Sequence, residues 1–326
     1  MIIHNANNFR TELHPKPSQP QIGFDSKLLT IGSCFSENIG LRLQENKFPS
    51  LVNPLGTVYN PISIFKLLGQ ESLDEHKFIE IGRQWFHLDF HSQFTGRDKK
   101  TLETVLKLKI KELSTYLSEA KVVFVTLGTA YVYEWKESGE VVANCHKIPQ
   151  KNFIKRLLTL EEMKVGFSKL KTKLNEINPS IHFVFTVSPV RHIKDGIAEN
   201  QLSKSLLRVL CHEWSQEEDQ VDYFPAYEMM MDDLRDYRFY KTDMIHPSEM
   251  AEDYIWNKFQ LTYFSDQIRK ILKEWSKIKA ALAHRPFNPE SESHQEFLKN
   301  QLSKLEIFSA YFSTEVEKNI LQQQIV

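Results

Sequence analysis

The chain has 326 residues, enough to bury the core of one large domain or of two modest ones. Lysine plus arginine (41) nearly balance aspartate plus glutamate (42), so the charge gives no reason to expect nucleic acid or an anionic membrane as the main partner. Its 3 cysteines are too few for a disulfide framework, and neither a signal peptide nor an apolar run of about 18 residues is found, so we expect a cytoplasmic protein.

Short apolar, β-branched runs alternate with longer segments of helical periodicity. The predicted strands are Leu28–Ile31, Leu51–Val52, Val122–Leu127, His182–Val187 and Val221–Phe224. Ser36 is predicted to cap a helix after the first strand, and further helices are predicted over about 101–118, 160–177, 198–217 and 226–236. This alternation is typical of βαβ units, and it predicts an α/β fold with a mostly parallel sheet.

Two segments interrupt the alternation. Phe78–Phe90 is predicted to form a hairpin that turns at Gly82-Arg83, and Tyr131–Asn144 another that turns at residues 137–140. Hairpins inserted after sheet strands usually wall a cleft.

The C-terminal part of the sequence is predicted to be helical. One long helix runs from about residue 250 to about Ala283, a Pro-containing segment breaks it, and a second helix begins near Glu292. We therefore predict an α/β domain over residues 1–250 and a C-terminal helical hairpin over 251–326 packed on it. These helices are a candidate interface for an oligomer.

Unusual turns follow several predicted strands. Gly32-Ser33-Cys34-Phe35 follows the first strand, Gly128-Thr129-Ala130 the third and Ser188–His192 the fourth. In open parallel sheets, ligands bind at the carboxyl ends of the strands, so these turns are expected to meet at one edge. At the first turn, small nucleophilic side chains stand at a helix N-terminus, where free N–H groups stabilise a thiolate or an oxyanion.

An acid-histidine pair occurs late in the sequence. Asp243 stands three residues before His246, a spacing that lets the carboxylate hold Nδ1–H while Nε2 faces a nucleophile. Such a spacing also arises by chance, but this is the only such pair in the chain and it follows the last predicted strand. The two features together predict nucleophilic acyl-transfer chemistry.

Other polar residues are weaker candidates. Arg191 and His192, directly after the fourth strand, can clamp a substrate carboxylate or phosphate, or simply form a surface salt bridge. His87, Asp89 and His91 share one face of a predicted strand but lack a fourth ligand, so a structural role is favoured over a metal. We expect neither a metal nor a cofactor.

The motifs together resemble the GSCFA-domain family, a bacterial group within the SGNH (GDSL-like) hydrolases. The matching segments are Gly32–Ser36, Asn144–Pro149, Ser188–His192, Tyr223–Glu228, Arg235–Tyr240 and Asp243–His246, which together cover most of the chain. The resemblance implies a three-layer α/β/α fold with a five-stranded parallel sheet, SGNH or flavodoxin-like. It also implies acyl transfer through a covalent intermediate, with Asp243 and His246 as acid and base, and His146 as a cleft residue.

The sequence departs from the superfamily at the nucleophile. The superfamily reads Gly-Asp-Ser, with serine as nucleophile. Aligned without gaps on Gly32, Ser33 takes the aspartate place and Cys34 the nucleophile place. Cys34 is therefore favoured, with Ser33 as the alternative if the turn is shifted by one residue.

A second departure affects the expected oxyanion hole. The Gly-x-Asn-Asp block of the superfamily appears as Gly128-Thr129-Ala130-Tyr131, so Ala130 replaces the asparagine donor. Losing such a donor costs about a hundredfold or more in rate. The Thr129 hydroxyl or a hairpin side chain is a candidate replacement, and Gly56 matches the second-block glycine and would donate its N–H.

These inferences predict an ester hydrolase that acts through an acyl-enzyme on a small-acyl ester. An acetyl ester of a saccharide is one candidate substrate, and no nucleic-acid or membrane partner is expected. An acyltransferase that uses the same residues, or a catalytically degenerate binding domain on the same fold, is the alternative.

Overall fold

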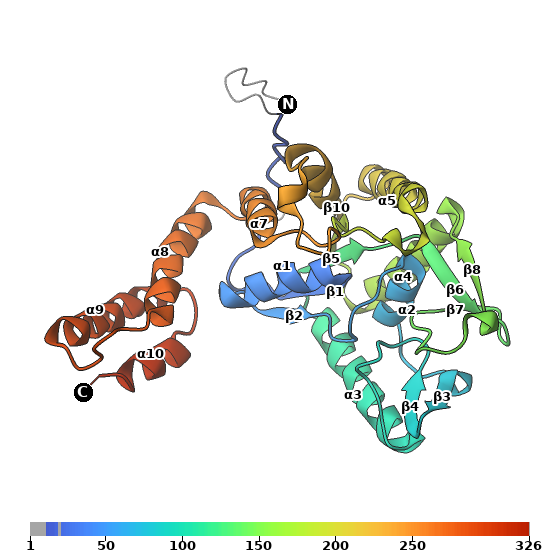
Figure 1. Ribbon diagram of the computed structural model, residues 1–326, viewed down its shortest axis with the longest axis horizontal. Helices are drawn as coiled ribbons and strands as arrows, with labels where there is room; N and C mark the ends of the chain where they lie inside the picture. Colours follow the sequence, from blue (N-terminus) through green and yellow to red (C-terminus); the bar gives the residue numbers. More distant parts are fainter. Residues whose placement is uncertain (1–10, 19–20, 326) are drawn as a thin grey trace.

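The computed structural model describes residues 11–18 and 21–325. A five-stranded sheet forms its centre, with the strand order β10-β9-β5-β1-β2. These strands are β1 (Leu28–Gly32), β2 (Ser50–Val52), β5 (Val122–Leu127), β9 (His182–Val187) and β10 (Val221–Tyr223). All neighbouring strands pair in parallel, so their carboxyl ends lie at one edge, as predicted (Figure 1).

Helices cover both faces of the sheet, because alternate strand residues point to opposite sides. Leu28, Phe124 and Val184 pack with α1 (Cys34–Glu45) and α7 (Glu249–Tyr263). The opposite face packs against α2 (Pro61–Leu68), α3 (Lys99–Leu117), α4 (Leu160–Ile177) and α5 (Ile197–Glu217). The predicted three-layer α/β/α architecture is therefore confirmed.

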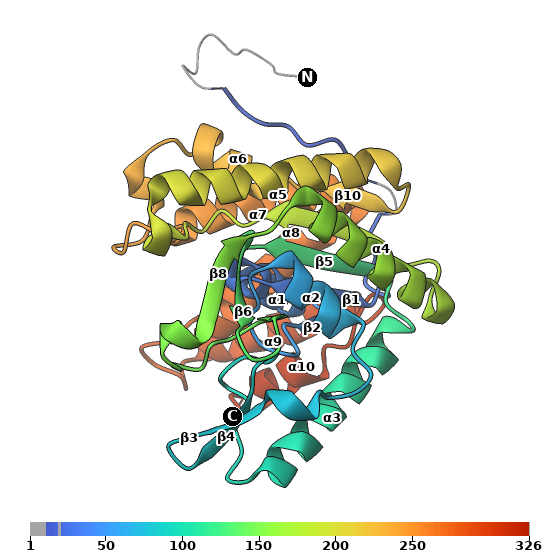
Figure 2. The same ribbon diagram turned by 90° about the vertical axis from the view of Figure 1, so that its right-hand side faces the viewer.

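Two small antiparallel sheets extend from this core. The first pairs β3 (Phe78–Ile81) with β4 (Gln84–His87), as predicted. The second, with the order β7-β6-β8, contains β6 (Tyr131–Trp135), β7 (Glu140–Val142) and β8 (Phe153–Leu157). Its hairpin is confirmed, but the third strand was not predicted. Figure 2 looks at the molecule from the side of these small sheets.

Three helix boundaries differ from the prediction. Ser36 is not a cap, because α1 begins at Cys34 and Ser33 is the extended N-cap residue. The segment predicted as a helix over 226–236 forms α6 (Ala226–Glu228) and then a π-helical turn over Met229–Asp233. The predicted long helix to Ala283 breaks at Phe264, which turns into the core with extended backbone and stacks on Phe48 at 4.7 Å between ring centroids.

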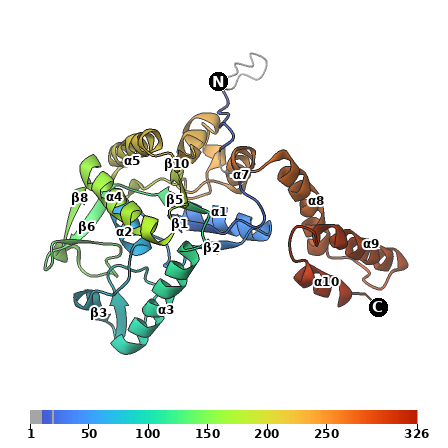
Figure 3. The ribbon, with the colours of Figure 1, turned by 180° about the vertical axis from the view of Figure 1, so that it is seen from behind.

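The C-terminal helices are α8 (Asp266–Ala283), α9 (Glu292–Phe308) and α10 (Glu315–Gln322), and they share an apolar cluster of their own. They lie to one side of the sheet, opposite the small sheets (Figure 3). Trp275 Nε1 donates to the carbonyl of Glu45 at 3.1 Å, and Lys47 pairs with Glu317 at 2.6 Å. The division into two domains at residue 250 stays a prediction, and α7 packs within the α/β core.

In the described part of the chain, no helix has the length and apolar character needed to cross a membrane.

Candidate active site

The turn after β1 brings two sheet strands and a helix into close contact. Gly32 has φ +135°, and a Cβ there would overlap the carbonyl oxygen of Thr126 on β5. The next residue, Ser33, donates its N–H to the same carbonyl at 3.1 Å. Glycine is required at this position because no other residue combines this backbone conformation with so close an approach.

The two nucleophile candidates in this turn differ in accessibility. Ser33 is 1% exposed, and its hydroxyl donates to Ser188 Oγ at 3.0 Å. Cys34 is the first residue of α1 and is partly exposed. Burial raises the pKa of the Cys34 thiol, while the N–H groups of Cys34 and Phe35 and the charge of Lys204 lower it. Cys34 is thus the candidate that an incoming substrate can reach.

The segment after β2 supports the turn from the side. Asn53 Oδ1 accepts from the Gly32 N–H at 3.0 Å and from the Ser36 hydroxyl at 3.2 Å. The Gly56 N–H donates to the Asn53 carbonyl at 2.8 Å. A Cβ at Gly56 would overlap His91. Gly56 therefore closes a local turn, and its N–H has an acceptor within that turn.

The Gly128-Thr129-Ala130 loop is built around Tyr59. Both the Gly128 and the Thr129 N–H donate to the Tyr59 carbonyl, at 2.7 and 3.1 Å. The Thr129 hydroxyl lies 3.1 Å from Ser203 Oγ and accepts from the Tyr131 N–H at 3.0 Å. The hydroxyl that the sequence offered as a replacement for the missing asparagine is therefore occupied by hydrogen bonds to its own loop and to α5.

Tyr59 was missed by the sequence analysis, because a tyrosine in a loop carries no distinctive spacing. Its ring lies against Gly128, where a Cβ would come within 3.0 Å of Tyr59 Cδ1. The residue is 40% exposed, and its ring centroid lies 6.2 Å from that of His192. Burial and the charge of Cys34 raise the pKa of Tyr59. The Tyr59 ring thus packs against the loop that lacks the asparagine, and the pKa of its phenol responds to the charge of Cys34.

Asp243 and His246 form the predicted pair. Asp243 Oδ2 lies 2.7 Å from His246 Nδ1, and Oδ1 accepts from the N–H groups of Ile245 and His246 at 2.8 and 3.0 Å. These hydrogen bonds lower the pKa of Asp243 to about 2, with the backbone bond from His246 as the largest cause. Both side chains are exposed, at 44% for Asp243 and 41% for His246. The carboxylate is ionised and fixes the imidazole through Nδ1, which leaves Nε2 available.

Hydrogen bonds and an ion pair anchor the loop that carries Asp243 and His246 to neighbouring segments. The Arg191 N–H donates to the Ile245 carbonyl at 3.2 Å. Glu252 on α7 pairs with Lys241 at 3.3 Å and accepts from Asn38 on α1 at 2.7 Å. The loop is therefore tied to the helix that begins with Cys34. Among the residues that the structure describes, no hydrogen bond joins His246 to Cys34 or Ser33.

Arg191 and His192 have structural partners. The Arg191 guanidinium lies over Tyr240 and Tyr237, at 4.4 and 5.3 Å from the ring centroids. His192 is half-buried beside Tyr59, and its N–H donates to Asn200 Oδ1 at 2.8 Å. Arg191 packs the segment before the Asp243 loop, so its role as a substrate clamp stays a prediction.

The histidines of the small sheets are buried. His146 Nε2 lies 3.0 Å from the His87 carbonyl, and burial lowers the pKa of His146, which keeps it neutral. Asp89 pairs with Lys66 at 2.7 Å and with Lys77 at 3.2 Å. Within residues 11–18 and 21–325, no cluster of three or more His, Cys, Asp or Glu is placed to hold a metal.

Lys204 on α5 is a second residue that the sequence analysis missed. It is 1% exposed, and its Nζ donates to the Ser188 carbonyl at 2.8 Å. Burial lowers the pKa of Lys204 to about 7, against the charge of Cys34, which raises it. The available signal was its position on the apolar stripe of α5, one helical turn before Leu207 and two before Cys211.

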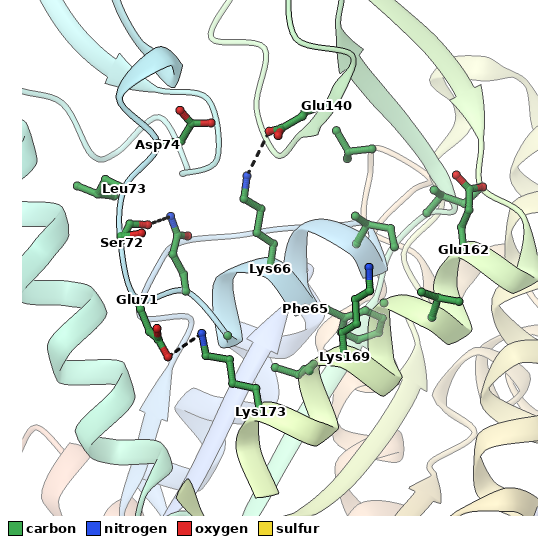
Figure 4. Close-up of a pocket in the computed structure, with 18 of the residues that line it drawn as sticks. Phe65, Lys66, Glu71, Ser72, Leu73, Asp74, Glu140, Glu162, Lys169 and Lys173 are labelled. Carbon is green, nitrogen blue, oxygen red and sulfur yellow. Dashed lines mark hydrogen bonds and ion pairs between the residues drawn. The ribbon is translucent and has the colours of Figure 1, made fainter. Parts of the chain in front are cut away.

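A cavity of about 790 Å³ lies elsewhere, between α2, α4 and the β7 and β8 strands (Figure 4). Its wall carries charges of both signs, including the ion pairs Lys66–Glu140 at 3.8 Å and Lys173–Glu71 at 2.7 Å. None of the candidate site residues is among the described residues that line it. It is therefore separate from the Cys34 turn.

Two matches to known protein families show to which family the chain belongs. Residues 27–259 match the GSCFA family, and residues 275–326 match the C-terminal domain of GSCFA domain proteins. The chain belongs to the GSCFA family. No curated protein matches this GSCFA chain.

Several solved structures are similar to the GSCFA chain in outline. A carbohydrate esterase family 3 protein from Talaromyces cellulolyticus is 7% identical, with a TM-score of 0.38, over 76% of this chain and 99% of its own. The family 3 carbohydrate esterase of Clostridium thermocellum is 11% identical, with a TM-score of 0.36, over 76% and 98%. The acetyl xylan esterase Est2A of Butyrivibrio proteoclasticus is 11% identical, with a TM-score of 0.35, over 81% and 67%. At these TM-scores, the chemistry has to be inferred from the residues of the GSCFA chain itself.

Proposed function

We propose that this GSCFA protein is an ester hydrolase that forms an acyl-enzyme on Cys34. One observation carries the proposal: a partly exposed thiol begins α1, at the carboxyl edge of a parallel sheet, beside a buried serine. A nucleophile must be reachable by the substrate, which favours Cys34 over the enclosed hydroxyl of Ser33.

In the proposed reaction, the Cys34 sulfur attacks the acyl carbon and the thiol proton passes to a neighbouring base, which returns it to the sulfur when the thioester is hydrolysed. His246, oriented through Nδ1 by Asp243, enters in its protonated form and gives its proton to the departing alcohol oxygen, and a thioester remains. Water then attacks the thioester with His246 as its base. The carboxylic acid leaves and the thiol is restored, so each turnover consumes one ester bond and one water molecule.

The oxyanion requires donors other than the superfamily asparagine, which Ala130 replaces. The N–H groups at the start of α1 are suited to this task, because they already lower the pKa of the Cys34 sulfur. The Tyr59 hydroxyl is the proposed additional donor. The Tyr59 ring packs against the Gly128 loop, and the pKa of its phenol responds to the charge of Cys34.

The proposed substrate carries a small acyl group, and acetylated saccharides are the class to test first. Hydrolysis and acyl transfer share the acyl-enzyme and differ only in the acceptor. We therefore propose hydrolysis with water as acceptor, and the assay must include sugar acceptors to detect transfer.

The decisive experiment replaces the two turn residues separately in the full chain. Cys34→Ala is expected to lower hydrolysis of an activated acetyl ester by at least about a thousandfold, because it removes the covalent route. Ser33→Ala is the matched control and is expected to retain most of the activity. Full activity in Cys34→Ala would refute the assignment, and acid release that requires a sugar acceptor would indicate a transferase.

A further inference from the structure

Lys204 differs from the other buried lysines of the described chain. Lys77 pairs with Asp89 and Glu140, at 3.2 and 2.5 Å, and Lys258 pairs with Glu12 at 3.4 Å. Lys204 has no carboxylate partner among the described residues, and its hydrogen bond runs to the Ser188 carbonyl. A fully buried lysine is rare without an ionic partner, and such residues are candidates for a functional role.

Ser188 connects Lys204 to the nucleophile turn. Its carbonyl oxygen accepts from Lys204 Nζ at 2.8 Å, and its hydroxyl oxygen accepts from Ser33 Oγ at 3.0 Å. Ser33 is the residue directly before Cys34. These two hydrogen bonds therefore link the buried amine of α5 to the turn through a single residue.

The titratable groups around Lys204 and Cys34 come from four segments of the chain. Glu37 on α1 raises the pKa of Cys34, and Lys204 lowers it. Tyr59, before α2, responds to the charge of Cys34, and His192, after β9, responds to that of Lys204. On the remaining side, the Tyr227 ring faces the Lys204 amine, with its centroid 5.8 Å from Nζ. None of these groups is a carboxylate in contact with Lys204, and the hydrogen bonds through Ser188 link its amine to the turn that carries Cys34.

We propose that Lys204 is the group that accepts the proton of Cys34, so that this lysine and cysteine act as a pair. The inference rests on the proposed function in taking Cys34 as the nucleophile. It assigns the first proton transfer to a buried amine and leaves His246 to act on the alcohol and on water.

The proton balance closes over one turnover. As the sulfur–carbon bond forms, the thiol proton passes to the neutral amine of Lys204, and His246 in its protonated form supplies the alcohol oxygen. In the second half, His246 takes a proton from the attacking water. The departing sulfur then recovers the proton held by Lys204, and both bases return to their starting states.

A pH dependence follows. Because burial lowers the pKa of Lys204 to about 7, the amine becomes neutral as the pH rises through that value. Cys34 reactivity is therefore expected to rise over the same range, since the pair titrates as a unit. Without the amine, the reactivity would follow the thiol alone, whose pKa is raised above its usual value.

The test measures iodoacetamide alkylation of Cys34 against pH in the full chain, followed by mass spectrometry of its peptide. Lys204→Met removes the amine and retains its apolar stem. Lys204→Gln also keeps a donor toward the Ser188 carbonyl, and it covers the case in which Lys204→Met fails to fold. Both are expected to lower the alkylation rate at pH 7.5 by about tenfold or more and to move the inflection up by about one pH unit or more. Lys258→Met, another buried lysine, is the matched control and should leave the profile unchanged.

Three outcomes would overturn the inference. They are an unchanged profile in both Lys204 variants, restoration of the wild-type profile by Lys204→Gln, and an equal shift in Lys258→Met. Because alkylation needs no substrate, the result is independent of the proposed function. Full ester turnover by Cys34→Ala would refute Cys34 as the nucleophile of the hydrolase, whereas the alkylation profile of the wild-type thiol would still show whether Lys204 controls its reactivity.

Discussion

The turn that carries Ser33 and Cys34 is buried and joins several elements, whereas the loop that carries Asp243 and His246 is exposed and holds its shape by its own hydrogen bonds. Ser33 is 1% exposed and contacts residues of β5 and of the segment after β9. The Asp243 carboxylate instead accepts hydrogen bonds from two backbone N–H groups of its own loop. Replacements that alter the backbone of the turn should therefore affect folding as well as activity, whereas those in the loop should affect mainly activity.

The largest effect is expected from Gly32→Ala. The new Cβ would overlap the Thr126 carbonyl in a backbone conformation that L-residues rarely adopt, so the free energy of unfolding should fall by at least about 3 kcal/mol. Denaturant unfolding followed by circular dichroism measures this. Gly82→Ala is the matched control, since Gly82 has a positive φ but open space around it, and it should cost about 1 kcal/mol. Equal losses in the two variants would show that the turn is less constrained than the contacts indicate.

The loop should respond in the opposite way. Asp243→Asn is expected to lower ester hydrolysis by about a hundredfold to ten-thousandfold, because the imidazole loses its orienting carboxylate. Its denaturant midpoint should change far less than that of Gly32→Ala, because the side chain is exposed and its hydrogen bonds stay within one loop. Asp236→Asn is the control, since Asp236 is also exposed and accepts from a nearby backbone N–H. Unfolding of Asp243→Asn at a lower denaturant concentration would contradict the contrast between turn and loop.

The smallest effect is expected outside both regions, at Tyr59, the proposed additional donor to the oxyanion. Tyr59→Phe should lower kcat by about tenfold, since it removes one donor while the N–H groups of α1 remain. The Tyr116 hydroxyl, which donates to the Pro49 carbonyl at 3.0 Å, gives the matched control Tyr116→Phe. An unchanged kcat in Tyr59→Phe would show that the Tyr59 hydroxyl does not stabilise the oxyanion and that backbone N–H groups alone do so.

Much of the fold was predictable because its signals are local. The bounds of β5 and β9 agree with the apolar runs in the sequence, and both hairpins turn where glycine stands. The third strand of the second small sheet was missed because the charged pair Lys155-Arg156 interrupts Phe153–Leu157, which therefore shows neither an apolar run nor a regular alternation. The break at Phe264 was missed because its cause is a stacking contact with Phe48, which is distant in the sequence.

The sequence by itself determined the α/β layers, the turn at Gly32 and the spacing of Asp243 and His246, because each depends on residues close together in the chain. Only the tertiary structure decided which residue after Gly32 is reachable, since the enclosure of Ser33 requires Ser188, which follows β9 and is distant in the sequence. It also packed Tyr59 against the Gly128 loop and linked the Lys204 amine to the turn through Ser188. These relations arise from burial and from contacts across the sheet, which no periodicity along one chain records.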